Sequence, residues 1–125
     1  EFLQAAKDLL GPKGWTDDAE KLEAASTPWR GTYKGHTPFL ARPASTEETA
    51  ALVKLCADHT VAITPQGGNT GLVDAGTPQG ELCDSMGRMR AVRDVDGFNN
   101  SLTIEAGAPL VDAQSAADDA NRLFP

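Results

Sequence analysis

The sequence contains few cysteines, few histidines and no long apolar run. Its 125 residues include two cysteines and two histidines. Two cysteines are too few for a disulfide framework, and none of these four residues has the spacing of a metal site. We therefore interpret Cys56 and Cys83 as free, buried thiols in a reducing compartment, which favours a cytoplasmic protein. Because no apolar run approaches the ~20 residues of a membrane-spanning helix, the sequence predicts no membrane span.

Basic residues are also scarce. The chain has 11 lysines and arginines against 18 acidic residues, which gives a net charge of −7. A surface that binds a nucleic acid needs clustered lysines and arginines, so this composition argues against nucleic acid as a partner. No lysine or arginine lies between Lys54 and Arg88. An anion bound in this stretch is therefore expected to contact backbone amides rather than cationic side chains.

The most distinctive stretch that is present is rich in glycine and follows a short apolar run at residues 61–63. It consists of Pro65, Gln66, Gly67, Gly68, Asn69, Thr70, Gly71 and Leu72. Proline ends a strand, whereas glycine and asparagine tolerate the positive φ values that we expect this loop to use. Such a loop can direct several backbone N–H groups toward one point and bind an anion there.

Two common nucleotide-binding motifs are absent from this loop. The dinucleotide fingerprint G-x-G-x-x-G fails because Asn69 and Thr70 follow the glycine pair. The spacing from Gly71 to Gly76 is that of a P-loop, but the required lysine does not follow. The stretch is also compatible with a plain turn between strands, since Gly-Gly and Asn-X pairs are frequent in turns. Composition leaves the anion-binding loop and the plain turn equally open.

The pattern of the remaining chain indicates an α+β fold that contains a βαβ unit. A strand at 38–42, a helix from Ser45 to about Asp58 and a strand at 61–65 predict two parallel strands with a right-handed crossover. Ser45 and Glu48 have the spacing of a capping box at the start of this helix. Further helices are predicted at 2–10, from Asp17 and from Pro109, and further strands at 81–86, 91–95 and 101–106.

Two aspartates do not fit this pattern well. Asp84 interrupts an otherwise apolar strand, so we expect that strand to lie near a sheet edge or Asp84 to face solvent. Asp74 follows the glycine loop, where a carboxylate would repel a bound phosphate. We expect it to point away from the loop or to pair with Arg88, Arg90 or Arg93.

Several segments of the chain, taken in order, resemble the vanillyl-alcohol-oxidase (PCMH-type) family of FAD-binding proteins. The branch that they resemble most contains D-2-hydroxyglutarate dehydrogenase, D-lactate dehydrogenase and glycolate oxidase. Residues 65–72 resemble the family's FAD pyrophosphate loop, and the resemblance covers nearly the whole chain. The other segments that carry it are 29–35, 42–48, 88–96, 102–107 and 122–125. Asp74-Ala75 departs from the family, which commonly has two glycines there.

The resemblance implies the first half of a PCMH-type FAD-binding domain, a βαβ unit with a mixed sheet flanked by helices. Residues 1–36 would form N-terminal helices and an irregular segment, and residues 37–125 the N-terminal part of the flavin domain. The amides of residues 67–71 would hold the FAD pyrophosphate, with hydrogen bonds from the Asn69 and Thr70 side chains. Pro65 and Leu72 would shape the walls. We assign no catalytic residue and no metal ligand, since the family carries these in a later substrate domain.

The implied reaction is the oxidation of a D-2-hydroxyacid to the 2-oxoacid, with hydride transfer from C2 of the substrate to N5 of FAD. The small 2-hydroxyacid would bind to the missing C-terminal domain, and the electron acceptor stays unknown. One alternative is a cell-wall sugar reductase of the same fold, although those enzymes lack the segment at 29–35. Another is a non-catalytic α/β module whose glycine loop is only a turn.

Overall fold

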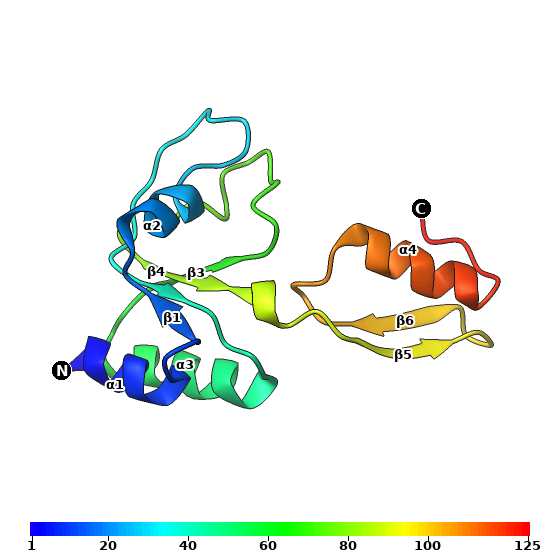
Figure 1. Cartoon of the computed structure of the whole chain (residues 1–125), viewed down its shortest axis with the longest axis horizontal. Coiled ribbons are helices and arrows are strands. Elements are labelled where there is room, and N and C mark those ends of the chain that lie inside the picture. The colour runs from blue at the N-terminus through cyan, green and yellow to red at the C-terminus, as the bar shows by residue number, and fades with distance from the viewer.

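The computed structural model describes residues 1–125 and consists of two lobes (Figure 1). The first lobe contains a four-stranded sheet with helices on both faces, and the second contains a β-hairpin covered by one helix. The first lobe comprises α1 (Phe2–Leu10), β1 (Trp15–Thr16), α2 (Ala19–Ala25), β2 (Leu40–Ala41), α3 (Thr46–Asp58), β3 (Ile63–Gln66) and β4 (Leu82–Ser85). After a 3-10 turn, η1 (Met86–Arg88), the second lobe comprises β5 (Val92–Asp96), β6 (Ser101–Ile104) and α4 (Leu110–Asp119). The mixed α/β architecture agrees with the sequence prediction.

The sheet of the first lobe has the order β1-β2-β4-β3. Strands β2, β4 and β3 are parallel, and β1 pairs antiparallel with β2. The predicted parallel orientation of β2 and β3 is therefore confirmed. The two strands are not neighbours, however, because β4 lies between them and pairs with both.

Helix α3 begins at the predicted capping box. The hydroxyl of Ser45 accepts a hydrogen bond from the Glu48 N–H at 3.1 Å, and the Glu48 carboxylate accepts one from the Ala44 N–H at 2.8 Å. Leu52 and Cys56 of this helix are buried against the sheet and α1. The main core consists of Ala6, Leu10, Phe39, Ala41, Leu52, Cys56 and Leu82. The core thus joins α1, α3 and the strands β2 and β4.

Helix α2 covers the opposite face of the sheet (Figure 1). Asp18 caps it by accepting a hydrogen bond from the Lys21 N–H at 3.1 Å, so the helix starts one residue later than predicted. Ala25, Leu40 and Cys83 form a second, smaller buried cluster on this side. This cluster fixes Ala25 at the end of α2, and the Ala25 carbonyl contacts the Gln66 side chain at the start of the glycine loop.

The expectation that Asp84 faces solvent is wrong, although β4 does lie next to the edge strand β3. Strand β4 has neighbours on both sides, and Asp84 is only 3% exposed. Its neighbours in the sheet register are Ala41 and Pro65, and the carboxylate oxygen Oδ1 has no hydrogen-bond partner. Burial favours the neutral form of a carboxyl group and raises the pKa of Asp84 to about 6.

The second lobe is small and ends in a regular helix cap. Ala113 and Ala117 are the buried residues of α4, which packs on the β5–β6 hairpin. Helix α4 ends at Asp119, and Asn121, which follows the C-cap residue Ala120, has a left-handed φ of 54°, as predicted. The Arg122 N–H donates to the Ala117 carbonyl at 2.8 Å, which is one of the two hydrogen bonds of a Schellman motif.

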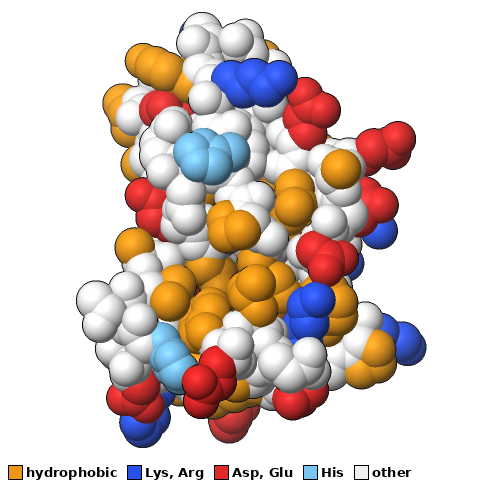
Figure 2. All heavy atoms as spheres, turned by 90° about the vertical axis from the view of Figure 1, so that its left-hand side faces the viewer, with side chains coloured by type: hydrophobic (Ala, Val, Ile, Leu, Met, Phe, Trp, Pro, Cys, Tyr) orange, Lys and Arg blue, Asp and Glu red, His pale blue; other side chains and the backbone are white.

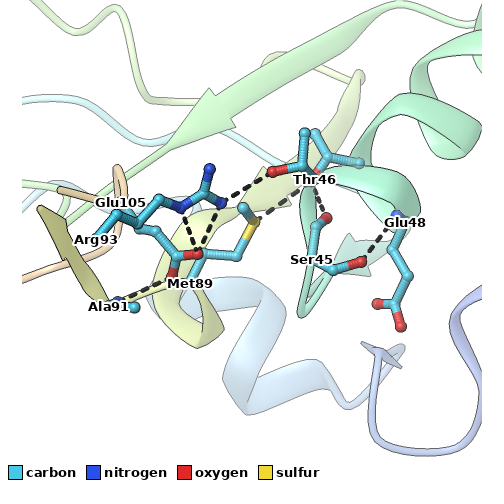
Figure 3. Close-up of polar contacts among 8 residues, drawn as sticks. Ser45, Thr46, Glu48, Met89, Ala91, Arg93 and Glu105 are labelled. Carbon is cyan, nitrogen blue, oxygen red and sulfur yellow. Dashed lines mark hydrogen bonds and ion pairs between the residues drawn. The ribbon is translucent and has the colours of Figure 1, made fainter. Parts of the chain in front are cut away.

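Side chains at the start of α3 tie the two lobes together (Figure 3). Arg93 of β5 donates to the Thr46 hydroxyl at 3.0 Å and to the Glu105 carboxylate at 2.8 Å. The Thr49 hydroxyl contacts the Met89 sulfur at 3.4 Å. The second lobe is thereby held against the same helix end that follows β2.

The core of the first lobe reaches the surface on one side. Figure 2 shows apolar side chains gathered in the lower half of the face that lies on the left in Figure 1. The partly buried apolar residues that pack against the core are Phe2, Leu9, Trp15, Leu55, Val61 and Ile63. None of the helices has the length and apolarity that crossing a membrane requires.

Candidate functional site

The glycine loop leaves the carboxyl end of β3. Open α/β sheets place their ligands at the carboxyl ends of parallel strands, so its position in the fold is that of a binding site. Seven of the eight predicted residues line one hollow of about 210 Å³, and Leu72, which is 64% exposed, does not line it. The lining consists of Pro28, Pro65, Gln66, Gly67, Gly68, Asn69, Thr70, Gly71, Asp74, Gly76 and Thr77.

The backbone amides of this loop are unpaired. No N–H group of residues 67–73 donates a hydrogen bond to any acceptor in the chain. Backbone amides that are not exposed to water are almost always paired, and a closed turn pairs at least one of its own. The loop therefore keeps a set of donors available for water or for a ligand.

The loop glycines are not required by the chain itself. Asn69 has a left-handed φ of 55°, and none of the glycines at 67, 68 and 71 has one. A Cβ atom added to Gly71 would meet nothing within 4 Å, and one added to Gly68 would lie 3.9 Å from its nearest neighbour, Thr70. At Gly67 the nearest atom would be the Ala106 carbonyl oxygen at 3.7 Å. These are ordinary contacts, so what glycine provides here is close access to the backbone from outside.

Other glycines of the chain are required for packing. A Cβ atom on Gly14, Gly35 or Gly107 would collide with the carbonyl oxygens of Leu10, Pro78 and Met86, respectively. The packing of the chain therefore excludes a side chain at these three positions but leaves space for one at Gly67, Gly68 and Gly71.

The irregular segment before β2 holds the loop in place. The Gln66 side chain donates to the carbonyl oxygens of Ala25 at 2.7 Å and Gly76 at 2.8 Å. The Asn69 side chain donates to the Thr27 carbonyl at 3.0 Å, and the Trp29 indole donates to the Thr70 carbonyl at 3.2 Å. The loop is therefore fixed at three points before any ligand arrives.

Replacement of Gln66 by leucine is expected to destabilise the fold by about 2 kcal/mol, because two carbonyl groups lose their donor in a buried position. Urea denaturation followed by far-UV circular dichroism measures the change. Replacement of the exposed Gln4 by leucine is the matched control and is expected to change stability by less than about 0.5 kcal/mol. Equal stability of the two variants would show that Gln66 does not anchor the loop.

Asp74 lies in the lining of the hollow and does not form any of the expected ion pairs. Its φ is 61°, and its Oδ1 atom is buried without a hydrogen-bond partner. The arginines have other partners: Arg88 donates to the Arg42 carbonyl at 2.9 Å, Arg90 contacts Asp112 at 3.7 Å and Arg93 contacts Glu105 at 2.8 Å. The expected ion pair between Asp74 and an arginine is therefore wrong.

A second hollow, of about 460 Å³, shares residues 66–69 with the first. Lys21 of α2 and Arg42, which follows β2, line it, and neither forms an ion pair. Sequence reasoning missed these cations because it considered only residues near the loop along the chain. Their positions depend on the pairing of strands and on the packing of α2.

The cysteines are buried and unpaired, as predicted. Burial, with a contribution from the charge of Asp84, raises the pKa of Cys83 to about 11. A thiol with this pKa carries almost no thiolate at neutral pH, so it has a packing role and not a nucleophilic one. No group of three or more histidine, cysteine, aspartate or glutamate side chains is arranged to hold a metal ion.

Comparison with known proteins agrees with this geometry. A family model described as "FAD binding domain" matches residues 37–125. A probable mitochondrial D-2-hydroxyglutarate dehydrogenase of Oryza sativa subsp. indica is 35% identical over 120 residues, which is 95% of this chain and 22% of that protein. The D-2-hydroxyglutarate–pyruvate transhydrogenase of Saccharomyces cerevisiae is 34% identical over 107 residues, which is 85% of this chain and 22% of that protein. The chain thus spans about 22% of the length of these relatives.

Solved structures show the same fold at lower identity. An alkyldihydroxyacetonephosphate synthase superposes with a TM-score of 0.82 at 24% identity, over 94% of this chain and 24% of that one. A 4-ethylphenol oxidase from Gulosibacter chungangensis superposes with a TM-score of 0.81 at 16% identity, over 96% of this chain and 24% of that one. The predicted PCMH-type fold is therefore confirmed. The chain belongs to the FAD-binding domain family of PCMH-type oxidoreductases, and FAD is its cofactor.

Proposed function

We propose that this chain is the N-terminal FAD-binding portion of an enzyme that oxidises a D-2-hydroxyacid to the 2-oxoacid. In this proposal residues 1–36 form the leading helices and the irregular segment, and residues 37–125 form the first part of the flavin domain. The rest of the flavin domain and the substrate domain follow in the parts of the relatives that this chain does not span. Relatives named as D-2-hydroxyglutarate dehydrogenases support the substrate class.

The observation that carries the proposal is the combination of unpaired amides and unconstrained glycines in one loop. The amides of residues 67–71 bind the negatively charged pyrophosphate of FAD, as anion-binding loops do. The absence of side chains at Gly67, Gly68 and Gly71 lets the phosphate oxygens reach the backbone. Pro65, Gln66, Asn69 and Thr70 shape the loop around them, whereas Leu72 lies outside the hollow. The bound flavin supplies the hydride acceptor, while this chain positions the nucleotide end of the cofactor.

The isolated chain is expected to bind FAD only weakly, with a dissociation constant above the micromolar range, because it holds only the pyrophosphate part of the site. Purified full-length enzyme is expected to carry flavin absorbance that D-2-hydroxyglutarate or D-lactate bleaches without oxygen. Absorbance spectroscopy and a titration of the isolated chain with FAD measure both. Micromolar binding by the isolated chain would show that the remaining parts are not needed for the cofactor.

Two alternatives make different predictions in the same experiment. A cell-wall sugar reductase of this fold would be bleached by NADPH and not by a hydroxyacid. A non-catalytic α/β module, in which the loop is a turn, would carry no flavin at full length. The unpaired amides of residues 67–73 favour a binding loop over a plain turn.

The compartment stays a prediction. The scarcity of cysteine favours the cytoplasm, whereas the plant relatives are named as mitochondrial proteins. Fractionation of cells that express the tagged full-length protein decides between the two.

A further inference from the structure

The second hollow beside the glycine loop differs in charge from the chain as a whole. The chain has a net charge of −7, yet this hollow of about 460 Å³ is lined by two cations, Lys21 and Arg42, and by no aspartate or glutamate. The first hollow has the opposite character, because its lining contains Asp74 and no lysine or arginine. An anion that approaches the loop is therefore attracted on one side and repelled on the other.

The sheet places Arg42 at the same edge as the loop. Ala41 of β2 and Pro65 of β3 are both register partners of Asp84 in β4. Arg42 and Gln66, the next residues along the two strands, therefore lie at the same level of the sheet. With β4 between them, β2 and β3 are roughly 10 Å apart, and an arginine side chain can cover most of this distance. The position of Arg42 beside the loop thus follows from the strand pairing.

The backbones of the two cations are fixed, while their charged groups are free. The Arg42 N–H donates to the Gly14 carbonyl at 2.7 Å, and the Arg42 carbonyl accepts a hydrogen bond from Arg88 at 2.9 Å. The Lys21 N–H donates to the Asp18 carboxylate at 3.1 Å in the first turn of α2. Neither the Arg42 guanidinium nor the Lys21 ammonium group forms a hydrogen bond or an ion pair within the chain. Both charges are therefore available to a ligand.

We propose that the FAD diphosphate lies on the side of the second hollow, where Lys21 and Arg42 bind its phosphate oxygens together with the loop amides. The inference rests on the proposed function and assigns it two further binding residues. Gly67 and Gly68 line both hollows. Because glycine has only backbone atoms, it is the loop backbone that borders the cationic hollow. The phosphates then accept hydrogen bonds from neutral amides and from two charged donors, and the charged bonds are the stronger ones.

The test is the binding of FAD to flavin-free full-length enzyme, measured by fluorescence titration. Lys21→Met and Arg42→Met are each expected to raise the dissociation constant about tenfold, the effect of losing one charge-assisted hydrogen bond. Arg42→Lys keeps the charge and is expected to regain part of the affinity. Lys13→Met is the matched control, because it removes one positive charge from an exposed residue that lines neither hollow. It is expected to bind FAD as the wild type does.

The dependence of binding on salt separates contact with the phosphates from a role in the fold. In the wild type, the affinity for FAD is expected to fall as NaCl rises from about 0.05 to 0.5 M, since salt screens the attraction between cations and phosphates. The double variant, Lys21→Met with Arg42→Met, is expected to lose most of this dependence. The thermal unfolding midpoints of the flavin-free proteins report any change in the stability of the fold.

The possible outcomes distinguish failure of this inference from failure of the proposed function. If the wild type binds FAD and Lys21→Met and Arg42→Met bind it as tightly as Lys13→Met does, the inference alone is overturned. Tighter binding by Asp74→Asn, with no change in the other variants, would instead place the diphosphate in the first hollow. Weaker binding with an unchanged salt dependence and a lower unfolding midpoint would assign the two cations to the fold, which also overturns the inference. A flavin-free wild type that binds no FAD would overturn the proposed function as well.

Discussion

Replacement of Gly68 by valine is expected to weaken FAD binding by the full-length enzyme about 100-fold while leaving the fold intact. The chain has room for the new side chain, because a Cβ atom on Gly68 meets its nearest neighbour at 3.9 Å. A ligand that contacts the loop backbone, however, needs the same space as the valine side chain. The branched side chain then occupies the space of the phosphate oxygens and covers the adjacent amides.

Two measurements separate the effect on binding from an effect on folding. Flavin content after purification and fluorescence titration with FAD report binding, and the thermal unfolding midpoint reports stability. Gly97→Val is the matched control, since Gly97 lies in the hairpin of the second lobe and its added Cβ would be 3.9 Å from Arg122. It is expected to keep its flavin. If Gly68→Val also keeps its flavin, the loop is a turn and not a cofactor site.

Replacement of Asp84 by valine is expected to stabilise the chain by about 3 kcal/mol at pH 7. This gain in the free energy of unfolding follows from the rise of the Asp84 pKa from 3.8 to about 6, at about 1.4 kcal/mol for each pKa unit. Because the folded state holds this proton more tightly than the unfolded state, the pH-dependent cost of ionising the carboxyl group is absent below about pH 4. Its cost grows as the pH rises from about 4 to 6 and is constant above that.

Urea denaturation at a series of pH values from about 3.5 to 7.5 measures this effect as the difference between variant and wild type. Asp84→Asn is the control that removes the charge but keeps a buried polar group, so it should remove the pH dependence and stabilise less than valine does. The difference between wild type and Asp84→Val is expected to widen with pH. Stability curves that run parallel across this range would show that Asp84 is solvated in the folded state.

Sequence reasoning succeeded where the signal is local. The capping box of Ser45 and Glu48 depends on residues within one helical turn, and the left-handed conformation of Asn121 depends on the end of its own helix. The position of the glycine loop also followed, because glycine marks the end of a strand. The expectation that Pro65 ends the strand is wrong, since Pro65 is paired within β3, which continues to Gln66. The resemblance added the cofactor, which no periodic pattern indicates.

The errors come from long-range packing. The sequence does not reveal that β4 lies between β2 and β3, so an aspartate in β4 looked like an edge residue. Lys21 and Arg42 reach the loop only through strand pairing and the packing of α2, which their distance along the chain conceals. The sequence also does not show which loop residue adopts positive φ, because glycine and asparagine both permit it without requiring it.

The packing of α1 also bears on where the flavin module begins. The family match starts at residue 37, but Ala6 and Leu10 fill the same core as Leu52 and Phe39. A polypeptide trimmed to the family boundary would expose that core to water along the whole inner side of α3. The first ten residues therefore complete the hydrophobic core, and the folding unit is longer than the segment that the family model matches.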